Sequence, residues 1–376
     1  GIEWLQQRGW QCTVITEECA EQAFHTDICP IYQMPAYHHL LLDTLCRGKD
    51  KALYQFAKQM VDINTFDLIF CSSYYYFPLY AAHLLAQEYH IPLAIDLRDI
   101  AEQWGDTVYF TRQLTPFKKL NYWIGKIYEH RQLRVRNRIL RSANIVTSVS
   151  PWHQNILAKY NANTHLIYNG YDANVFVPKD IICDYFYITY LGKLYSTQLR
   201  DPRLLFEALR QLTSEEKIDS KHVRVLFHTD PNGMQQLQEL GEYYQIAPLL
   251  NINGYIPRQA ILPVMYQSSI LLVLTTLSTP TGTHGIMGTK FFENIGIEKP
   301  ILCVRSDEEC LADAIQKTNA GIAATSVDEV KTFIMEKYQE WLQQGYTRQT
   351  VINKEQFTRQ HEAEQFEQLF IQTLKS

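Results

Sequence analysis

The sequence has 376 residues, which at roughly 150 residues per domain predicts two or three domains. Hydrophobic residues make up 46% of it and charged residues 20%, a composition that provides for buried cores and excludes a disordered chain. The formal net charge of −5 argues against a protein that coats nucleic acid. No apolar run approaches the ~18–20 residues of a membrane span.

In the first half, short apolar runs alternate with longer amphipathic segments. Residues 1–10 read as a helix, and the predicted strands then fall at 12–16, 67–73, 92–99, 143–150 and 164–170, with helices at 51–63, 78–90, 118–141 and 151–160. Nearly all-apolar strands separated by helices are typical of a parallel sheet covered on both faces. Because such a sheet begins with a strand, we infer that the first strand and its glycine-rich turn are absent or lie upstream of residue 1.

The second half repeats this pattern after a turn-rich linker at about 170–184. Its predicted strands are 185–192, 223–228, 249–255, 270–276, 299–305 and 321–325, with helices at 201–213, 231–245, 258–267, 288–297, 308–318 and 327–343. A last amphipathic helix, 354–374, places Phe357, Phe366, Leu369 and Phe370 on one predicted apolar stripe, which needs a partner surface. The chain therefore reads as an α/β protein with two doubly wound domains.

The cysteines indicate a reducing compartment. There are eight, and none stands in a Cys-x-x-Cys pair. We therefore expect neither a zinc site nor a disulfide framework, and we expect a cytoplasmic protein.

Charged residues follow two of the predicted strands. Open parallel sheets bind ligands beyond the carboxyl ends of their strands, so these positions matter most. After the strand 185–192, Gly192 lets the backbone approach a ligand, and Lys193 and Arg200 can hold a diphosphate; the alternative is two solvated surface cations. Arg98 and Asp99 end the apolar segment 92–99, where the alternative to a functional role is a salt bridge that fixes the loop.

A glycine-rich loop leads into the predicted helix 288–297. Free backbone N–H groups and the helix dipole make such a helix start an anion site. Glu293, three residues after Lys290 on the same face, can accept two vicinal hydroxyl groups such as those of a ribose. The alternative is an ordinary helix start with an i,i+3 ion pair.

The order of these segments resembles the glycosyltransferases of GT-B fold, especially the retaining, family 4-like group. The matching segments, which span about residues 1–305, are GIEWLQQRGWQCTVIT, AIDLRDIAEQW, ANIVTSVS, HLIYNGYDANVF, YLGKLYSTQLRDP, NGYIP and GTKFFENIGIEKPILCV. Within this group the chain is similar to bacterial polysaccharide-assembly enzymes, and more closely to cyanobacterial glycosyltransferases of heterocyst envelope polysaccharide.

The resemblance implies two Rossmann-like domains that face each other across a cleft. Residues 1–170, joined by a C-terminal crossover helix at 354–376, correspond to the acceptor-side domain. Residues 171–353 correspond to the domain that binds the nucleotide sugar. The linker residues Asn169 and Asp172 are expected to be structural.

The same resemblance assigns roles to the candidate residues by position. The donor diphosphate is assigned to Lys193, Arg200 and the helix start formed by Gly288, Thr289 and Lys290. Glu293 is assigned to the donor ribose, Tyr255 and Ile256 to the nucleobase, and Arg98 and Asp99 to a loop that faces the acceptor and the reacting sugar. Many family members carry a second Glu eight residues before the ribose-binding one, where this chain has Gly285. The loop backbone or His284 is then expected to contact the transferred sugar.

These assignments predict transfer of a hexose from a nucleotide sugar, with UDP-glucose as the expected donor, to a glycan or lipid-linked acceptor, with retention. Lys193, Arg200 and the helix N–H groups would stabilise the departing diphosphate, so no metal and no cofactor is expected; no Asp-x-Asp motif of metal-dependent sugar transferases occurs. An inverting reaction would need a general base, for which Asp99 is the first candidate. Two alternatives stay open: a nucleotide-sugar epimerase of the same fold, and a non-catalytic two-domain protein that closes on a small ligand.

One segment has a charge opposite to that of the whole chain. Residues 110–141 contain nine Lys or Arg and one acid, Glu129, a balance of 9 − 1 = +8. Phe117, Trp123 and Ile127 lie among these cations, a pattern that predicts docking on an anionic membrane surface, at the inner face of the plasma membrane. The alternative is a helix with solvated cations whose aromatic residues pack in the core. No nucleic-acid-binding motif accompanies the basic run, so no nucleic-acid partner is expected.

Overall fold

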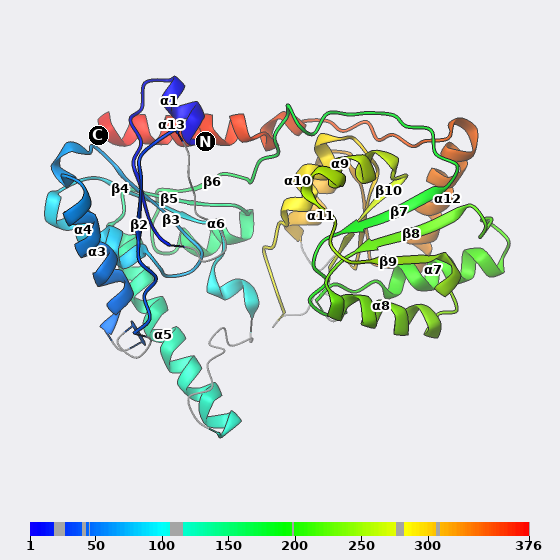
Figure 1. Ribbon diagram of the computed structural model, residues 1–376, viewed down its shortest axis with the longest axis horizontal. Coiled ribbons are helices and arrows are strands. Elements are labelled where there is room, and N and C mark those ends of the chain that lie inside the picture. Colours follow the sequence, from blue (N-terminus) through cyan, green and yellow to red (C-terminus); the bar gives the residue numbers. More distant parts are fainter. Residues whose placement is uncertain are drawn as a thin grey trace. The chain divides into compact units, whose positions relative to one another are not determined.

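The structure, a computed structural model, describes residues 1–18, 27–39, 43–44, 46–105, 116–197, 199–275, 282–305 and 309–375. The chain divides into two units (Figure 1). Unit 1 comprises Gly1–Tyr168 and Gln360–Ser376, and unit 2 comprises Asn169–Arg359.

Unit 1 is built on a parallel four-stranded sheet in the order β3-β4-β5-β6, with a separate parallel pair β1-β2. The strands are β1 (Val14–Glu17), β2 (Ile31–Met34), β3 (Ile69–Ser73), β4 (Leu93–Leu97), β5 (Ile145–Ser148) and β6 (Thr164–Leu166). Every residue of β4 and β5 is buried, which agrees with their apolar sequences and with a sheet covered on both faces.

The helices of unit 1 are α1 (Ile2–Gln7), α3 (Gly48–Met60), α4 (Leu79–Tyr89), α5 (Lys118–Ser142) and α6 (Pro151–Leu157), with short 3₁₀ turns η1 (Ile63–Thr65) and η2 (Ala101–Trp104). Residues of α4, α5 and α6 pack on the sheet face that carries Leu93, Ile95 and Leu97. Asp50 of α3 joins two helices, because its Oδ1 accepts the backbone N–H groups of Tyr80 and Ala81 at 3.1 and 3.2 Å in the first turn of α4.

The last helix, α13 (Arg359–Lys375), covers the other face of the same sheet. Phe366 and Phe370 pack against Ala94 and Ile145, with Leu369 and α1 residue Leu5 at the margin, and Figure 1 shows α13 beside α1. β4 therefore points alternate residues at α4 and at α13, as the two-residue period of a strand requires.

The predicted helix 354–374 is wrong in one respect. Thr358 has an extended backbone (φ −87°, ψ 150°) and separates the 3₁₀ turn η4 (Lys354–Phe357) from α13. Phe357 therefore leaves the predicted stripe and packs in unit 2, with its ring centroid 5.8 Å from that of Phe291 and 5.6 Å from that of Phe292.

Unit 2 contains a parallel six-stranded sheet in the order β12-β11-β10-β7-β8-β9. Its strands are β7 (Phe186–Leu191), β8 (Val223–His228), β9 (Leu250–Asn253), β10 (Ile270–Leu274), β11 (Ile301–Val304) and β12 (Gly321–Ala324). Its helices are α7 (Arg203–Ser214), α8 (Pro231–Tyr243), α9 (Arg258–Gln267), α10 (Thr289–Gly296), α11 (Glu309–Lys317) and α12 (Val327–Gln344), with the 3₁₀ turn η3 (Ala247–Leu249). Phe186, Ile188 and Phe227 pack on one face with α7 and α12, whereas Leu191 and Leu271 pack on the other with α9. Both units are thus doubly wound, as predicted.

One strand was not expected from the sequence. β2 is only four residues long and contains Gln33, so its pattern neither alternates nor forms a continuous apolar run. It pairs in parallel with β1 from Val14↔Ile31 to Glu17↔Met34.

Candidate functional site

The loop after β7 carries two cations, Lys193 and Arg200. The Lys193 ammonium group is exposed and lies 4.8 Å from the centre of the Tyr195 ring. Arg200 Nη1 donates to the backbone oxygen of Leu199 at 3.1 Å. Within the described parts of the chain neither side chain pairs with a carboxylate, because the neighbouring Asp201 is held instead by Arg203 and Arg305, at 2.6 and 3.0 Å.

Hydrogen bonds with the side chains of Tyr190, Thr229 and Asp230 fix the backbone of this loop. Tyr190 Oη donates to the backbone oxygen of Lys193 at 3.0 Å. The Leu194 N–H donates to Thr229 Oγ1 and to Asp230 Oδ2, each at 3.0 Å. Although burial opposes it, the N–H groups of Gly233 and Leu194 lower the pKa of Asp230, which keeps this anchor ionised.

The sequence did not predict these anchoring residues. Asp230-Pro231 directly after β8 is a recognisable helix start, and Asp230 does cap α8 through the Gly233 N–H. Its second role, on a loop 36 residues earlier, has no local pattern.

The helix α10 begins without a capping side chain. Its N-cap residue is Gly288, and among the described residues no side chain caps the helix, so its first N–H groups can receive an anion. Gly285 adopts a left-handed backbone (φ +70°) in the preceding loop. Lys290 Nζ and Glu293 Oε2 lie 2.9 Å apart and are partly exposed, so the i,i+3 ion pair foreseen as the alternative is present.

The side chains of Tyr255 and Ile256 lie in different environments. The Tyr255 side chain is 61% exposed, and its pKa is raised by burial and by the nearby charges of Asp230 and Tyr195. Ile256 is partly buried and packs against the cluster that contains Leu191.

The strand order brings these loops of unit 2 to one edge. β10, β7, β8 and β9 are consecutive neighbours, and their carboxyl ends lead to the loops at Gly192–Arg200, Asp230 and Tyr255, while α10 starts after β10. Cations, helix N–H groups and a carboxylate at a single sheet edge form a site suited to a phosphorylated, hydroxylated ligand.

In unit 1, Arg98 forms the salt bridge that was the alternative to a functional role. Its Nε lies 2.5 Å from Asp96 Oδ2, and its Nη2 lies 2.7 Å from Glu362 Oε1 on α13. The guanidinium carbon is also 5.5 Å from the centre of the Phe366 ring. Arg98 thus clamps α13 to the end of β4, and its predicted role toward the acceptor stays a prediction.

Asp99 lies beside a group of aromatic side chains. Its Oδ1 accepts the Gln103 Nε2–H at 2.9 Å, and burial raises the pKa of its carboxyl against the hydrogen bonds from Gln103 and Tyr74. Tyr74 is 63% exposed, and its ring is perpendicular to that of Tyr75 at a centroid distance of 5.1 Å.

This aromatic group is braced by the 3₁₀ turn η2. Trp104 Nε1 donates to Tyr75 Oη at 2.9 Å, and Glu102 accepts Arg136 Nη1 and Nη2 at 2.7 and 2.6 Å. Among the described residues, neither ring nitrogen of the nearby His153 has a hydrogen-bond partner, and burial lowers the pKa of His153 to about 4, so it is neutral. The sequence pattern that could have indicated this group is the run of three consecutive tyrosines after β3.

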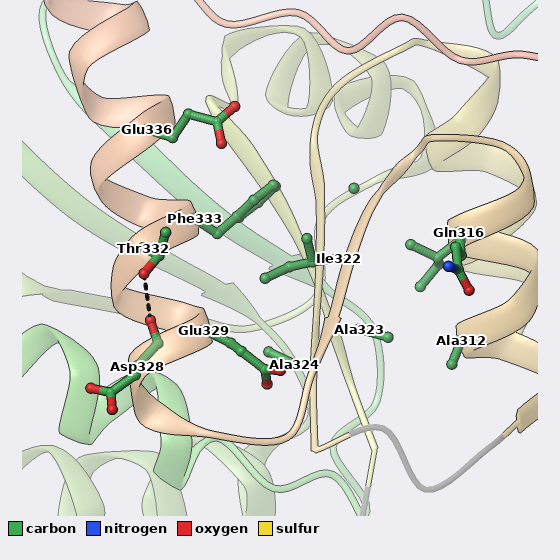
Figure 2. A pocket seen from close by; sticks show the side chains of 12 residues that line it. Ala312, Gln316, Ile322, Ala323, Ala324, Asp328, Glu329, Thr332, Phe333 and Glu336 are labelled. Carbon is green, nitrogen blue, oxygen red and sulfur yellow. Dashed lines mark hydrogen bonds between the residues drawn. The ribbon is translucent and has the colours of Figure 1, made fainter.

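One hollow of about 620 Å³ lies elsewhere, beside the edge strand β12 (Figure 2). Ile322 and Phe333 line it, and Asp328, whose backbone oxygen accepts the Thr332 hydroxyl at 2.8 Å, belongs to its rim. None of the candidate residues contributes to this hollow.

In the part of the chain that the structure describes, no three His, Cys, Asp or Glu side chains are grouped so that they could hold a metal ion. Nor does that part of the chain contain a helix with the length and apolar character needed to cross a membrane.

Comparison with known proteins finds similarity to glycosyltransferases. Residues 2–175 match the model of Glycosyltransferase Family 4. Sucrose-phosphate synthase from Thermosynechococcus elongatus is similar in structure over 98% of this chain and 90% of its own, with a TM-score of 0.64 and 14% identity. A glycosyltransferase from Rickettsia africae covers 100% and 93%, with a TM-score of 0.61 and 13% identity.

A third similar structure is HepE of Anabaena in complex with UDP and glucose, which covers 92% of this chain and 87% of its own at a TM-score of 0.59 and 15% identity. No curated protein sequence matches the chain. Because these sequence identities are below 25%, the structural similarity shows the fold alone, and it confirms the predicted GT-B fold.

Proposed function

We propose that this chain of GT-B fold, which matches Glycosyltransferase Family 4 at residues 2–175, is a glycosyltransferase that transfers a hexose from UDP-glucose to a glycan or lipid-linked acceptor, with retention. The observation that carries the proposal is the edge of unit 2 where Lys193 and Arg200, neither paired with a described carboxylate, accompany the uncapped start of α10. HepE of Anabaena, solved with UDP and with UDP-glucose, supports UDP-glucose as the donor.

The leaving group determines what these residues do. As the bond between the sugar and the diphosphate breaks, negative charge develops on the diphosphate oxygens. Lys193, Arg200 and the first-turn N–H groups of α10 stabilise that charge, and the hydrogen bonds of Tyr190 and Asp230 hold the loop in place beforehand. This accounts for leaving-group stabilisation without a metal ion, which is part of the proposal.

Glu293 supplies the contact with the donor ribose. Its carboxylate accepts the two ribose hydroxyl groups, and its ion pair with Lys290 orients both side chains before the donor binds. Lys290 then adds a third cation at the α10 start.

The acceptor is assigned to the aromatic group of unit 1. An exposed tyrosine ring offers an apolar face for a sugar ring, and Asp99 offers a carboxylate for its hydroxyl groups. In the retaining reaction the acceptor hydroxyl attacks from the face that the diphosphate leaves, and its proton passes to the departing phosphate oxygen. Asp99 therefore orients the acceptor and does not serve as the base.

Calorimetry with UDP tests the donor site. Loss of a hydrogen bond to a charged group costs about 1.5–3 kcal/mol, so Glu293→Ala should bind UDP about 10- to 150-fold more weakly. Glu239→Ala, at an exposed position of α8, is the matched control and should bind as the wild type does. Unchanged UDP affinity in Glu293→Ala would remove this residue from the site.

Turnover tests the reaction. UDP release from UDP-glucose should require a glycan or lipid-linked acceptor, with the glucose recovered on that acceptor in its original anomeric configuration. Conversion of UDP-glucose to another nucleotide sugar without an acceptor would identify an epimerase instead, and binding without turnover a non-catalytic protein.

A further inference from the structure

The first half of α5 carries apolar side chains that the core of unit 1 does not use. Trp123 is 64% exposed, Ile127 62% and Leu120 47%. In Figure 1 these first turns extend beyond the other labelled helices and strands of unit 1. The alternative of aromatic residues buried in the core is therefore wrong for this part of the helix.

These residues belong to one outward stripe of the helix. Positions three and four residues apart share a helical face, and the buried residues Gly125, Gln132, Arg136 and Ile139 mark the inward one. On the opposite face the same spacing continues past Ile127 into four exposed arginines, Arg131, Arg134, Arg138 and Arg141. The stripe is thus apolar over its first turns and basic over its last.

The acid of this segment does not neutralise the stripe. Glu129 has a side chain that is only 13% exposed and lies 3.6 Å from Lys126. The buried cation of the helix, Arg136, is already bound to Glu102 of η2. Among the described residues no carboxylate pairs with Arg134, Arg138 or Arg141, so these arginines present their charge to whatever faces the helix.

We propose that this stripe docks unit 1 on an anionic lipid bilayer. Leu120, Trp123 and Ile127 insert at the level of the headgroups, and the arginines contact lipid phosphates. Two other occupants fit less well. A second copy of the chain would bring the same arginines against each other, and a nucleic-acid backbone would leave the apolar residues without a contact. Docking does not depend on the transfer reaction, and only its use in reaching a lipid-linked acceptor rests on the proposed function.

Vesicle flotation of the full chain tests the basic half of the stripe. The chain should float with vesicles of phosphatidylcholine mixed with phosphatidylglycerol at low salt, and much less with phosphatidylcholine alone or at high salt. Each cation near an anionic surface strengthens binding about fivefold, so Arg134→Glu with Arg138→Glu should weaken it at least ~25-fold. Lys217→Glu with Lys221→Glu in unit 2 changes the net charge equally and should have no effect.

A second pair of variants tests the apolar half. Trp123→Ser with Ile127→Ser should weaken vesicle binding more than about tenfold, whereas Tyr243→Ser with Leu342→Ser, at exposed apolar positions of α8 and α12, should not. All four double variants should keep the wild-type circular dichroism and UDP affinity, which separates a failure of docking from a failure of the donor site.

Three results would overturn the proposal. One is equal recovery in the supernatant with neutral and anionic vesicles at low salt. Another is wild-type binding by both α5 variants. The third is a dimer in solution that the Trp123→Ser and Ile127→Ser exchange dissolves, with no vesicle binding by the wild type.

Discussion

Replacing Arg98 distinguishes a clamp between β4 and α13 from a group that acts on the acceptor. The Asp96 carboxylate is 1% exposed and accepts the Arg98 guanidinium at 2.5 Å. Arg98→Met would leave that carboxylate buried, and the remaining side-chain donors among the described residues are the hydroxyl groups of Thr147 at 2.7 Å and Ser72 at 3.3 Å. Breaking a buried pair in this way costs about 3–5 kcal/mol, whereas the more exposed pair with Glu362 adds at most ~1 kcal/mol.

Urea unfolding followed by tryptophan fluorescence measures this loss. Of the six tryptophans only Trp341 lies in unit 2, so the signal reports mainly on unit 1. We expect Arg98→Met to lower the free energy of unfolding of unit 1 by about 3 kcal/mol or more, because the two remaining hydroxyl groups compensate only in part. Arg138→Met, at an exposed position of α5, should change it by less than ~0.5 kcal/mol.

A double-mutant cycle attributes the loss to the buried charge. Adding Asp96→Asn to Arg98→Met removes the uncompensated carboxylate, so the double variant should recover about 2 kcal/mol relative to Arg98→Met alone. The clamp would be refuted if Arg98→Met unfolded like the wild type while transfer was lost. That result would return Arg98 to the acceptor side of the reaction.

The other predictions concern the diphosphate contacts and the pH dependence of stability. Lys193→Ala and Arg200→Ala should each lower kcat more than tenfold with an unchanged Tm, because charge on the leaving group is stabilised mainly in the transition state. Steady-state kinetics at wild-type values in both variants would exclude a role of these two residues in holding the diphosphate. Burial raises the pKa of Asp50 from 3.8 to about 6, so folding favours its protonated form and the associated stability is lost as the pH rises from about 4 to 6. Asp50→Asn keeps the acceptor for Tyr80 and Ala81 and should therefore gain up to about 3 kcal/mol at pH 7 and nothing near pH 4. Urea midpoints at the two pH values measure this, and a less stable variant at pH 7 contradicts it.

Most of the secondary structure follows from local patterns. β4 and β8 were predictable because each is a short, mainly apolar segment between two amphipathic helices. α8 was predictable because Asp230-Pro231 is a typical helix start. β2 and the break at Thr358 were not, because neither changes the apolar pattern of its surroundings. In both places contacts within a folded unit, such as those of Phe357 with Phe291, decide the conformation.

Contacts between distant residues escaped for a different reason. Arg98 was chosen for its charge at the end of a strand, but its partner Glu362 is 264 residues away. Asp50 caps a helix that begins about 30 residues later. In the sequence, neither Glu362 nor Asp50 carries a feature that distinguishes it from an ordinary surface carboxylate. Only the fold identifies these two contacts.

The same difference separates the two proposed sites. The residues proposed to hold the diphosphate stand in continuous stretches of sequence, Gly192–Arg200 and Gly285–Glu293, so a local pattern can suggest them. The residues proposed to contact the acceptor come from separate loops, with Tyr74 after β3 and with Asp99 and Trp104 after β4. Their grouping depends on the pairing of β3 with β4 from Ile69↔Leu93 to Ser73↔Leu97 and on the turn η2. Acceptor preference should therefore change with substitutions at Tyr74 or Trp104 that leave the affinity for UDP unaltered.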